Sequence, residues 1–141
     1  MAHTKLSVSA LILLTLYAVA ENVDAQEKCV EQPQEGECLS QSERRYWYYE
    51  PSSKTCKMQR ANTCAVSSNR FNNDLECYRS CQTVAEICGS QQVRGTCRAL
   101  IWSAYYSAEN NSCETFVYGG CNGNGNRFND IDECTRFCVH P

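Results

Sequence analysis

The residues best suited to chemistry are twelve cysteines, an even number in a chain of 141 residues. Thiols can cross-link as disulfides, bind a metal or act as nucleophiles. Zinc sites usually use C-x-x-C pairs or closely spaced histidines, but the sequence has no such pair, and its only histidines are His3 and His140. A dense and even set of cysteines in an exported chain indicates a disulfide framework. We therefore expect six disulfides, with no metal and no other cofactor.

Histidine content also bears on catalysis. A Ser-His-Asp or Cys-His arrangement needs an imidazole beside the nucleophile to accept its proton. Past the N-terminal segment only His140 remains, one residue from the end of the sequence. We expect no enzyme of that kind and assign no catalytic residue.

The N-terminal segment predicts export. An uncharged apolar run from Leu6 to Ala20 is followed by small residues suited to signal peptidase, ending at Ala20 and Ala25. The run is shorter than the ~20 residues of a membrane span. We expect residues 1–25 to be a cleaved signal peptide, with cleavage after Ala20 as the alternative, and the protein to be secreted and extracellular. From Gln26 onward twelve Lys and Arg face fourteen Asp and Glu, which favours neither nucleic acid nor an anionic membrane as partner.

Cysteine spacing reveals an internal repeat. The intervals between successive cysteines are 9, 18, 8, 13 and 4 in the first six, and 9, 16, 8, 13 and 4 in the last six. This predicts two copies of one small domain, at 29–81 and 88–138, joined by a linker at 82–87. Cores this small are marginal, so disulfides typically worth ~2–4 kcal/mol each would supply the stability. The linker lacks Gly, Pro and Ser, so we expect close domains with restricted freedom.

Aromatic and β-branched runs in each copy predict a β-hairpin. The expected strand–turn–strand segments are 102–106, 108–111 and 113–118 in the second copy, and 45–49, 51–53 and 55–61 in the first. Near the end of each copy, Asn73-x-x-Glu76 and Asp130-x-x-Glu133 resemble capping boxes that open a short helix. The last two cysteines of each copy stand four residues apart, so on a helix they share the face toward the hairpin.

Together with Phe116–Cys121 and Asn126-Arg127-Phe128, the spacing of the second copy resembles the Kunitz/pancreatic trypsin inhibitor family. The first copy fits less well but keeps its six cysteines and Asn69-Arg70-Phe71. The resemblance implies a small disulfide-rich α+β fold: two tandem domains, each with a twisted two-stranded hairpin, a short C-terminal α-helix and three disulfides. The implied disulfides are Cys29–Cys81, Cys38–Cys64, Cys56–Cys77, Cys88–Cys138, Cys97–Cys121 and Cys113–Cys134.

In members of this family the residue after the second cysteine enters the protease's primary specificity pocket. Here that residue is Arg98, so the resemblance implies Arg98–Ala99 as the reactive bond and a trypsin-like serine protease as partner, since an aspartate in the pocket rewards a guanidinium. The implied protease-contact residues are Gly95, Thr96 and Cys97 before the bond, Leu100, Ile101 and Trp102 after it, and Gly119, Gly120 and Cys121 beside it.

The first copy departs from this pattern. Its equivalents of the reactive residues are Cys38, Leu39 and Ser40, and Leu39 suits chymotrypsin-like or elastase-like pockets instead. Its second interval is two residues longer, and Asn62-Thr63 replaces Gly119-Gly120; the β-branched Thr63 is poorly suited to unusual backbone angles. We do not expect this copy to inhibit a trypsin-like enzyme. Four acidic residues around its loop favour a basic protein surface as its partner: Glu31, Glu35, Glu37 and Glu43.

Several alternatives stay open. A signal peptide followed by two unequal, acidic domains is similar to salivary anticoagulants of ticks, which suggests coagulation, kallikrein or plasmin-type targets. A non-inhibitory binding module, such as an ion-channel-blocking toxin, is the competing interpretation, although those toxins usually display clustered basic residues. An adhesive module is a third. We expect a monomer, with Asn110, in the sequon Asn110-Asn111-Ser112, as a candidate glycosylation site in the hairpin turn.

Overall fold

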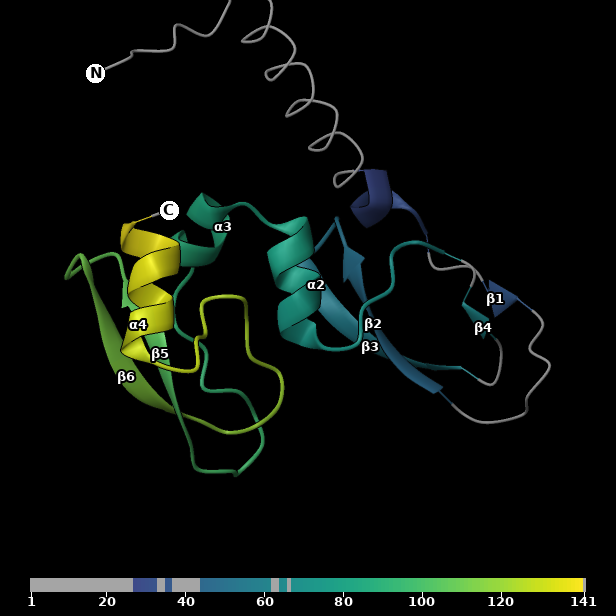
Figure 1. The fold of residues 1–141 in the computed structure, drawn as a ribbon. Helices are drawn as coiled ribbons and strands as arrows, with labels where there is room; N and C mark the ends of the chain where they lie inside the picture. The colour runs from purple at the N-terminus through teal and green to yellow at the C-terminus, as the bar shows by residue number, and fades with distance from the viewer. Residues whose placement is uncertain (1–26, 33–34, 37–43, 62–63, 66, 141) are drawn as a thin grey trace, which may run out of the picture.

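The computed structural model describes residues 27–32, 35–36, 44–61, 64–65 and 67–140. Two domains lie side by side, each with an antiparallel hairpin and a helix packed against it (Figure 1). The predicted signal peptide and the first-copy residues Cys38, Leu39 and Ser40 lie outside the described residues. Among the helices that are described, none is long and apolar enough to cross a membrane.

The first domain is built on strands β2 (Arg44–Glu50) and β3 (Thr55–Ala61), paired from Arg44↔Ala61 to Glu50↔Thr55. Its C-terminal helix is α2 (Asp74–Cys81). The two-residue strands β1 (Glu35–Gly36) and β4 (Cys64–Ala65) form a second small ladder. The core between hairpin and helix contains Tyr49, Phe71 and Tyr78 together with buried cysteines.

The second domain repeats this plan with β5 (Ile101–Ser107) and β6 (Ser112–Tyr118), paired from Ile101↔Tyr118 to Ser107↔Ser112. Its C-terminal helix is α4 (Ile131–Cys134), which continues as the π-helical turn η1 (Thr135–Val139). Phe128 is buried in its core and bridges Ala104, just as Phe71 bridges Trp47 in the first domain. The predicted hairpins and turn positions are therefore confirmed, with strands one residue longer at some ends.

Each C-terminal helix begins as the sequence predicts, although the capping boxes are only half formed. The Asn73 and Asp130 side chains cap α2 and α4 by accepting from the N–H groups of Glu76 and Glu133. The two glutamates do not accept in return from these caps; their carboxylates accept from the N–H groups of the preceding residues, Asn72 and Asn129.

A complete capping box lies instead in the predicted linker. Thr83 and Glu86 exchange the two reciprocal hydrogen bonds at the start of α3 (Val84–Gly89). The segment 82–87 is thus largely helical rather than an irregular connector. It also places Ile87, which is fully buried, in the core of the second domain.

The described cysteines form five disulfides and none is free. They are Cys29–Cys81, Cys56–Cys77, Cys88–Cys138, Cys97–Cys121 and Cys113–Cys134. These are five of the six pairs that the family resemblance implies. Of the sixth pair, Cys38–Cys64, Cys38 lies outside the described residues.

Candidate functional site

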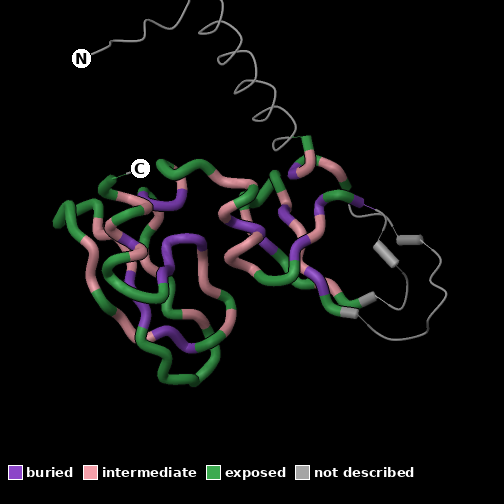
Figure 2. The backbone as a smooth tube through the Cα atoms, viewed as in Figure 1, coloured by how far each residue is buried: buried purple, intermediate pink, exposed green. Residues whose placement is uncertain are grey.

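A continuous exposed segment leads into strand β5. Every residue from Thr96 to Trp102 is exposed, including apolar side chains that would ordinarily be withdrawn from water: Leu100 is 83% exposed and Trp102 is 71% exposed. Figure 2 shows this exposed stretch at the end of the second domain that lies away from α3 and α4. We refer to residues 95–102 as the Arg98 loop. Exposed apolar residues gathered on one loop mark an interaction surface.

Exposure does not make the loop loose, because three links tie it and the preceding Arg94 to the segment Gly119–Cys121. The Cys97–Cys121 disulfide joins the two segments, with 5.4 Å between the Cα atoms. The N–H of Ala99 donates to the carbonyl of Gly119 at 2.9 Å, and the N–H of Gly119 donates to the carbonyl of Arg94 at 2.7 Å. The backbone on both sides of Arg98 is therefore held in place.

This close approach depends on two glycines. A Cβ on Gly119 would overlap the carbonyl oxygen of Cys97, and a Cβ on Gly95 would overlap the carbonyl oxygen of Cys121. Gly95 also has φ +78°, a conformation that side-chain-bearing residues rarely adopt. A side chain at either position would therefore force the two backbones apart.

Arg98 itself is held at the backbone and free at the side chain. Its guanidinium makes no hydrogen bond or ion pair with any residue that the structure describes, and the residue is exposed. The backbone is clamped on both sides while the cation is exposed to solvent. Such a group is ready to pair with a carboxylate on a partner.

Two side-chain hydrogen bonds also hold the loop, and the sequence analysis predicted neither of them. Asn122, at φ +54°, donates from its side chain to the Thr96 hydroxyl at 2.7 Å. Arg94 donates from Nε to the carbonyl of Val117 at 3.2 Å. The Asn122-Gly123 dipeptide indicates a turn in the sequence, since asparagine tolerates the left-handed region in turns. No pattern in the sequence indicates the contact of Arg94.

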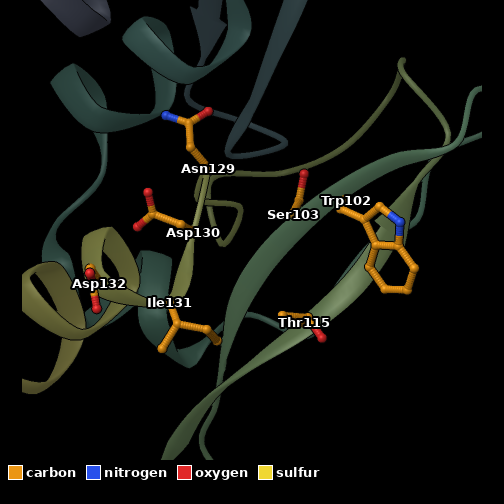
Figure 3. A pocket seen from close by; sticks show the side chains of 7 residues that line it. All are labelled: Trp102, Ser103, Thr115, Asn129, Asp130, Ile131 and Asp132. Carbon is orange, nitrogen blue, oxygen red and sulfur yellow. The ribbon is translucent and has the colours of Figure 1, made fainter.

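Beside the loop, a surface pocket of about 330 Å³ lies between the hairpin and the start of α4. Figure 3 shows the seven residues that line it, with the Trp102 indole turned away from the other side chains. Asp130 lines the pocket, but its carboxylate already accepts from the N–H of Glu133. Trp102 thus neither fills the pocket nor packs in the core, which favours its role as a contact residue of the loop.

The titratable groups with displaced pKa values lie elsewhere. Hydrogen bonds from Asn110 and from the Tyr105 hydroxyl lower the pKa of the Glu114 carboxyl, at the end of the hairpin opposite the loop. Among the described residues no group of histidine, cysteine and acidic side chains could hold a metal ion. The geometry of the Arg98 loop is suited to binding a partner through a fixed backbone and a free cation.

The remaining predicted site residues are in the first domain. Cys38, Leu39 and Ser40 lie outside the described residues, as do Asn62 and Thr63. Gly36, two residues before Cys38, pairs with Cys64 across the β1–β4 ladder. This is the same place that Gly95 occupies against Cys121 in the second domain.

Comparison with known proteins agrees with the repeat. The model of the Kunitz/bovine pancreatic trypsin inhibitor domain matches twice, at residues 28–82 and 87–139. Inter-alpha-trypsin inhibitor of Capra hircus is 37% identical over 107 residues, which are 76% of this chain and 85% of that protein. Papilin of Caenorhabditis elegans is 39% identical over 92 residues, or 65% of this chain. The nuclear magnetic resonance structure of Ixolaris, studied with Factor X, is 31% identical with a TM-score of 0.42, covering 82% of this chain and 97% of Ixolaris.

The chain spans only 4% of the length of papilin. Its two matched segments nevertheless cover both predicted domains, from one residue before the first cysteine to one residue after the last. Domains of this family are disulfide-rich, typical of extracellular proteins, and act as inhibitors that bind serine proteases rather than as enzymes. The chain therefore belongs to the Kunitz/bovine pancreatic trypsin inhibitor family, with two of its domains in tandem.

Proposed function

We propose that the protein is a secreted inhibitor of trypsin-like serine proteases, and that Arg98 enters the enzyme's primary specificity pocket. The observation that carries the proposal is a free, exposed guanidinium on a backbone held from both sides by Cys97–Cys121 and by the Ala99–Gly119 hydrogen bond. A trypsin-like pocket ends in an aspartate, which pairs with a guanidinium through charge-assisted hydrogen bonds. Inter-alpha-trypsin inhibitor, the relative from Capra hircus, carries inhibition of trypsin in its name.

Rigidity explains why such a loop would inhibit instead of being consumed. A loop already held in its bound conformation loses little further entropy on binding, so more of the contact energy appears as affinity. If the enzyme attacks the Arg98–Ala99 bond, the Ala99 side of the cut remains tied to Gly119 and cannot diffuse away. Resealing of the bond then competes with hydrolysis.

In this proposal the contact surface extends along the exposed side chains that follow the bond. Leu100, Ile101 and Trp102 all project into solvent beside Arg98. Large exposed aromatic side chains at the centre of an interface often contribute much of the binding energy. Trp102 is the strongest candidate for a second anchor.

For the first domain we propose a separate role as a contact to a basic surface outside the protease's active site, in an anticoagulant of the double-domain kind. Its support is compositional: Leu39 replaces arginine, and acidic residues surround the loop. The competing function is that of a non-inhibitory binding module such as a channel blocker. Inhibition constants against coagulation proteases, plasmin and kallikrein discriminate the two, because a channel blocker would inhibit none of them.

Arg98→Ala tests the central claim. Truncating a charge-paired anchor typically costs ~2–5 kcal/mol or more, roughly a 30-fold to several-thousand-fold loss of affinity. We expect the inhibition constant for trypsin to rise by that factor with folding intact, since the side chain is exposed and makes no hydrogen bond or ion pair with a described residue. The matched control is Leu39→Ala, which should leave trypsin inhibition almost unchanged. Full potency of Arg98→Ala would overturn the proposal.

A further inference from the structure

The two domains are joined by charged contacts as well as by the chain. Among the described residues two ion pairs cross between the domains, Asp74–Arg127 and Arg79–Glu133. A third, Lys54–Glu86, joins the first domain to helix α3 at the junction. The first is the best shielded from solvent, with side chains 14% and 9% exposed. The Lys54–Glu86 pair is the most exposed. These pairs therefore differ in the energy that they can contribute, since exposed ion pairs contribute little.

Arg127 has two partners. Its Nη2 donates to both carboxylate oxygens of Asp74, at 3.0 and 2.9 Å. Its guanidinium also lies over the ring of Tyr118, 3.9 Å from the centroid. A guanidinium over an aromatic face is attracted by the ring, and more strongly when both are shielded from water. The first residue of α2 thus holds a cation of the second domain in place over a buried tyrosine.

Tyr118 is the residue before Gly119, whose carbonyl accepts from the N–H of Ala99. Its ring also supports the other side of the loop. A Cβ on Gly95 would lie 3.2 Å from the ring atom Cε2 of Tyr118, so ring and loop backbone are in close contact there. Movement of the ring would therefore be transmitted to both segments that hold Arg98.

We propose that Asp74 of the first domain is a positioning residue for the Arg98 loop of the second, acting through Arg127 and Tyr118. The proposal rests on the proposed inhibitory function of that loop. The carboxylate fixes the guanidinium, the guanidinium fixes the ring, and the ring fixes the backbone around Gly95 and Gly119. The first domain thereby contributes to inhibition by the second independently of any contact that its own loop makes with the protease.

The test compares two neutralising variants of the full-length protein. Asp74→Asn removes the charge that holds Arg127, yet its remaining oxygen can still accept from the N–H of Leu75 as Asp74 does. Lys54→Gln removes the exposed ion pair to α3 at the junction of the same two domains. We expect Asp74→Asn to raise the inhibition constant for trypsin about tenfold and Lys54→Gln to change it less than twofold.

A readout without protease separates this proposal from the function on which it rests. The Ala99 N–H, bonded to the carbonyl of Gly119, reports the loop; the Ala104 N–H, bonded to the carbonyl of Phe128, reports the core of the same domain. By amide hydrogen exchange, Asp74→Asn should speed exchange at Ala99 about tenfold and leave Ala104 unchanged, because local opening differs from global unfolding. If the unaltered protein fails to inhibit trypsin, the proposed function falls while the exchange comparison still decides the role of Asp74.

Arg127→Lys is the second variant, and it decides the matter if Asp74→Asn does not fold. An ammonium can still pair with Asp74 but lacks the flat group that lies over Tyr118. It should give the same tenfold changes at Ala99 and in trypsin inhibition. Unchanged Ala99 exchange, equal acceleration at Ala99 and Ala104, or an equal effect of Lys54→Gln would each overturn the proposal.

Discussion

Asn69 and Asn126 occupy the same place in the two domains and make nearly the same hydrogen bonds. Each amide oxygen accepts from the N–H of a hairpin tyrosine, Tyr49 or Tyr106, at 2.8 Å. Each amide nitrogen donates to the carbonyl of that same tyrosine and to one near the domain's N-terminal end. The buried hydrogen bonds around these asparagines, which we call the shared frame, are therefore the same in kind and in geometry in both copies.

The copies diverge where the chain approaches the second cysteine. Gly119-Gly120 in the second domain corresponds to Asn62-Thr63 in the first, and Tyr118 corresponds to Ala61. Without a tyrosine at that place, the arginine after the buried asparagine lies over a different ring: Arg70 over Tyr46 at 5.4 Å, compared with Arg127 over Tyr118 at 3.9 Å.

The difference separates the requirements of folding from those of binding. Disulfides, buried asparagine and core phenylalanine suffice for the fold, and both copies keep them. A loop that clamps an exposed arginine needs glycine at both places where backbones nearly touch. The first copy keeps Gly36 at the place of Gly95 but has Asn62 at the place of Gly119. The following variants test this difference between the two domains.

Importing the first copy's residue into the second should have the largest effect. Gly119→Asn places a Cβ onto the carbonyl oxygen of Cys97, so the backbone beside Arg98 must move. In enzymes a misplacement of ~1 Å can cost about a hundredfold in rate. Because this loop binds as a substrate does, we expect a rise of similar size in the inhibition constant for trypsin. Gly89→Asn is the matched control, because nothing lies within 4 Å of its Cβ. An equal effect at both glycines would show that the comparison is wrong.

Removing the shared frame should affect the two domains alike. Asn126→Ala leaves the N–H and carbonyl of Tyr106 and the carbonyl of Ser90 without this partner, and Asn69→Ala does the same around Tyr49. Since each unpaired buried group costs ~1–3 kcal/mol, we expect each variant to lower the free energy of unfolding by about 3 kcal/mol in urea denaturation. The exposed Asn129→Ala should cost less than ~1 kcal/mol. A large cost in one domain alone would contradict the shared frame.

Acid should weaken the contact at the junction of the domains. The hydrogen bond from Lys54, with further hydrogen bonds from Thr83, lowers the pKa of the Glu86 carboxyl from 4.5 to about 2. Because the folded-state pKa is the lower one, this carboxylate stabilises the fold above pH 4.5, and the contribution disappears as the pH falls toward 2.

Glu86→Gln provides the measurement. The variant should be less stable than the unaltered protein at pH 6, by about 1 kcal/mol or less since the pair is partly exposed. The two should converge at pH 2. A gap in urea midpoint that stayed constant between pH 6 and pH 2 would exclude this role of the carboxylate.

The smallest effect is expected at Asn110, in the turn at the far end of the second hairpin from Ile101. A glycan there would be remote from the Arg98 loop. Asn110→Gln, expressed in secretory cells, should lose any glycan mass and inhibit trypsin within twofold of the unaltered protein. A tenfold change would mean that this turn contributes to the binding surface.

Much of the fold was predictable because it is encoded locally. The hairpins follow from aromatic and β-branched runs around short turns, and the caps Asn73 and Asp130 follow from their spacing to glutamate. Helix α3 was also readable, since Thr83-x-x-Glu86 is a capping box in the sequence. The helix was not predicted because the cysteine spacing places those residues in the linker between the two repeats. The π-helical turn after α4 had no such local signal.

The repeat, the family and the place of Arg98 next to the second cysteine follow from residue types and their spacing along the chain, and the family resemblance implies the disulfide pairs. Which of these residues cooperate follows from the folded structure alone. Asp74 and Arg127 are 53 positions apart and belong to different copies. Their pairing depends on how two folded bodies dock, with Tyr78 against Gly125 and the short helix α3 between them. Such cooperation depends on the distance between residues in space, which their spacing along the chain does not reveal.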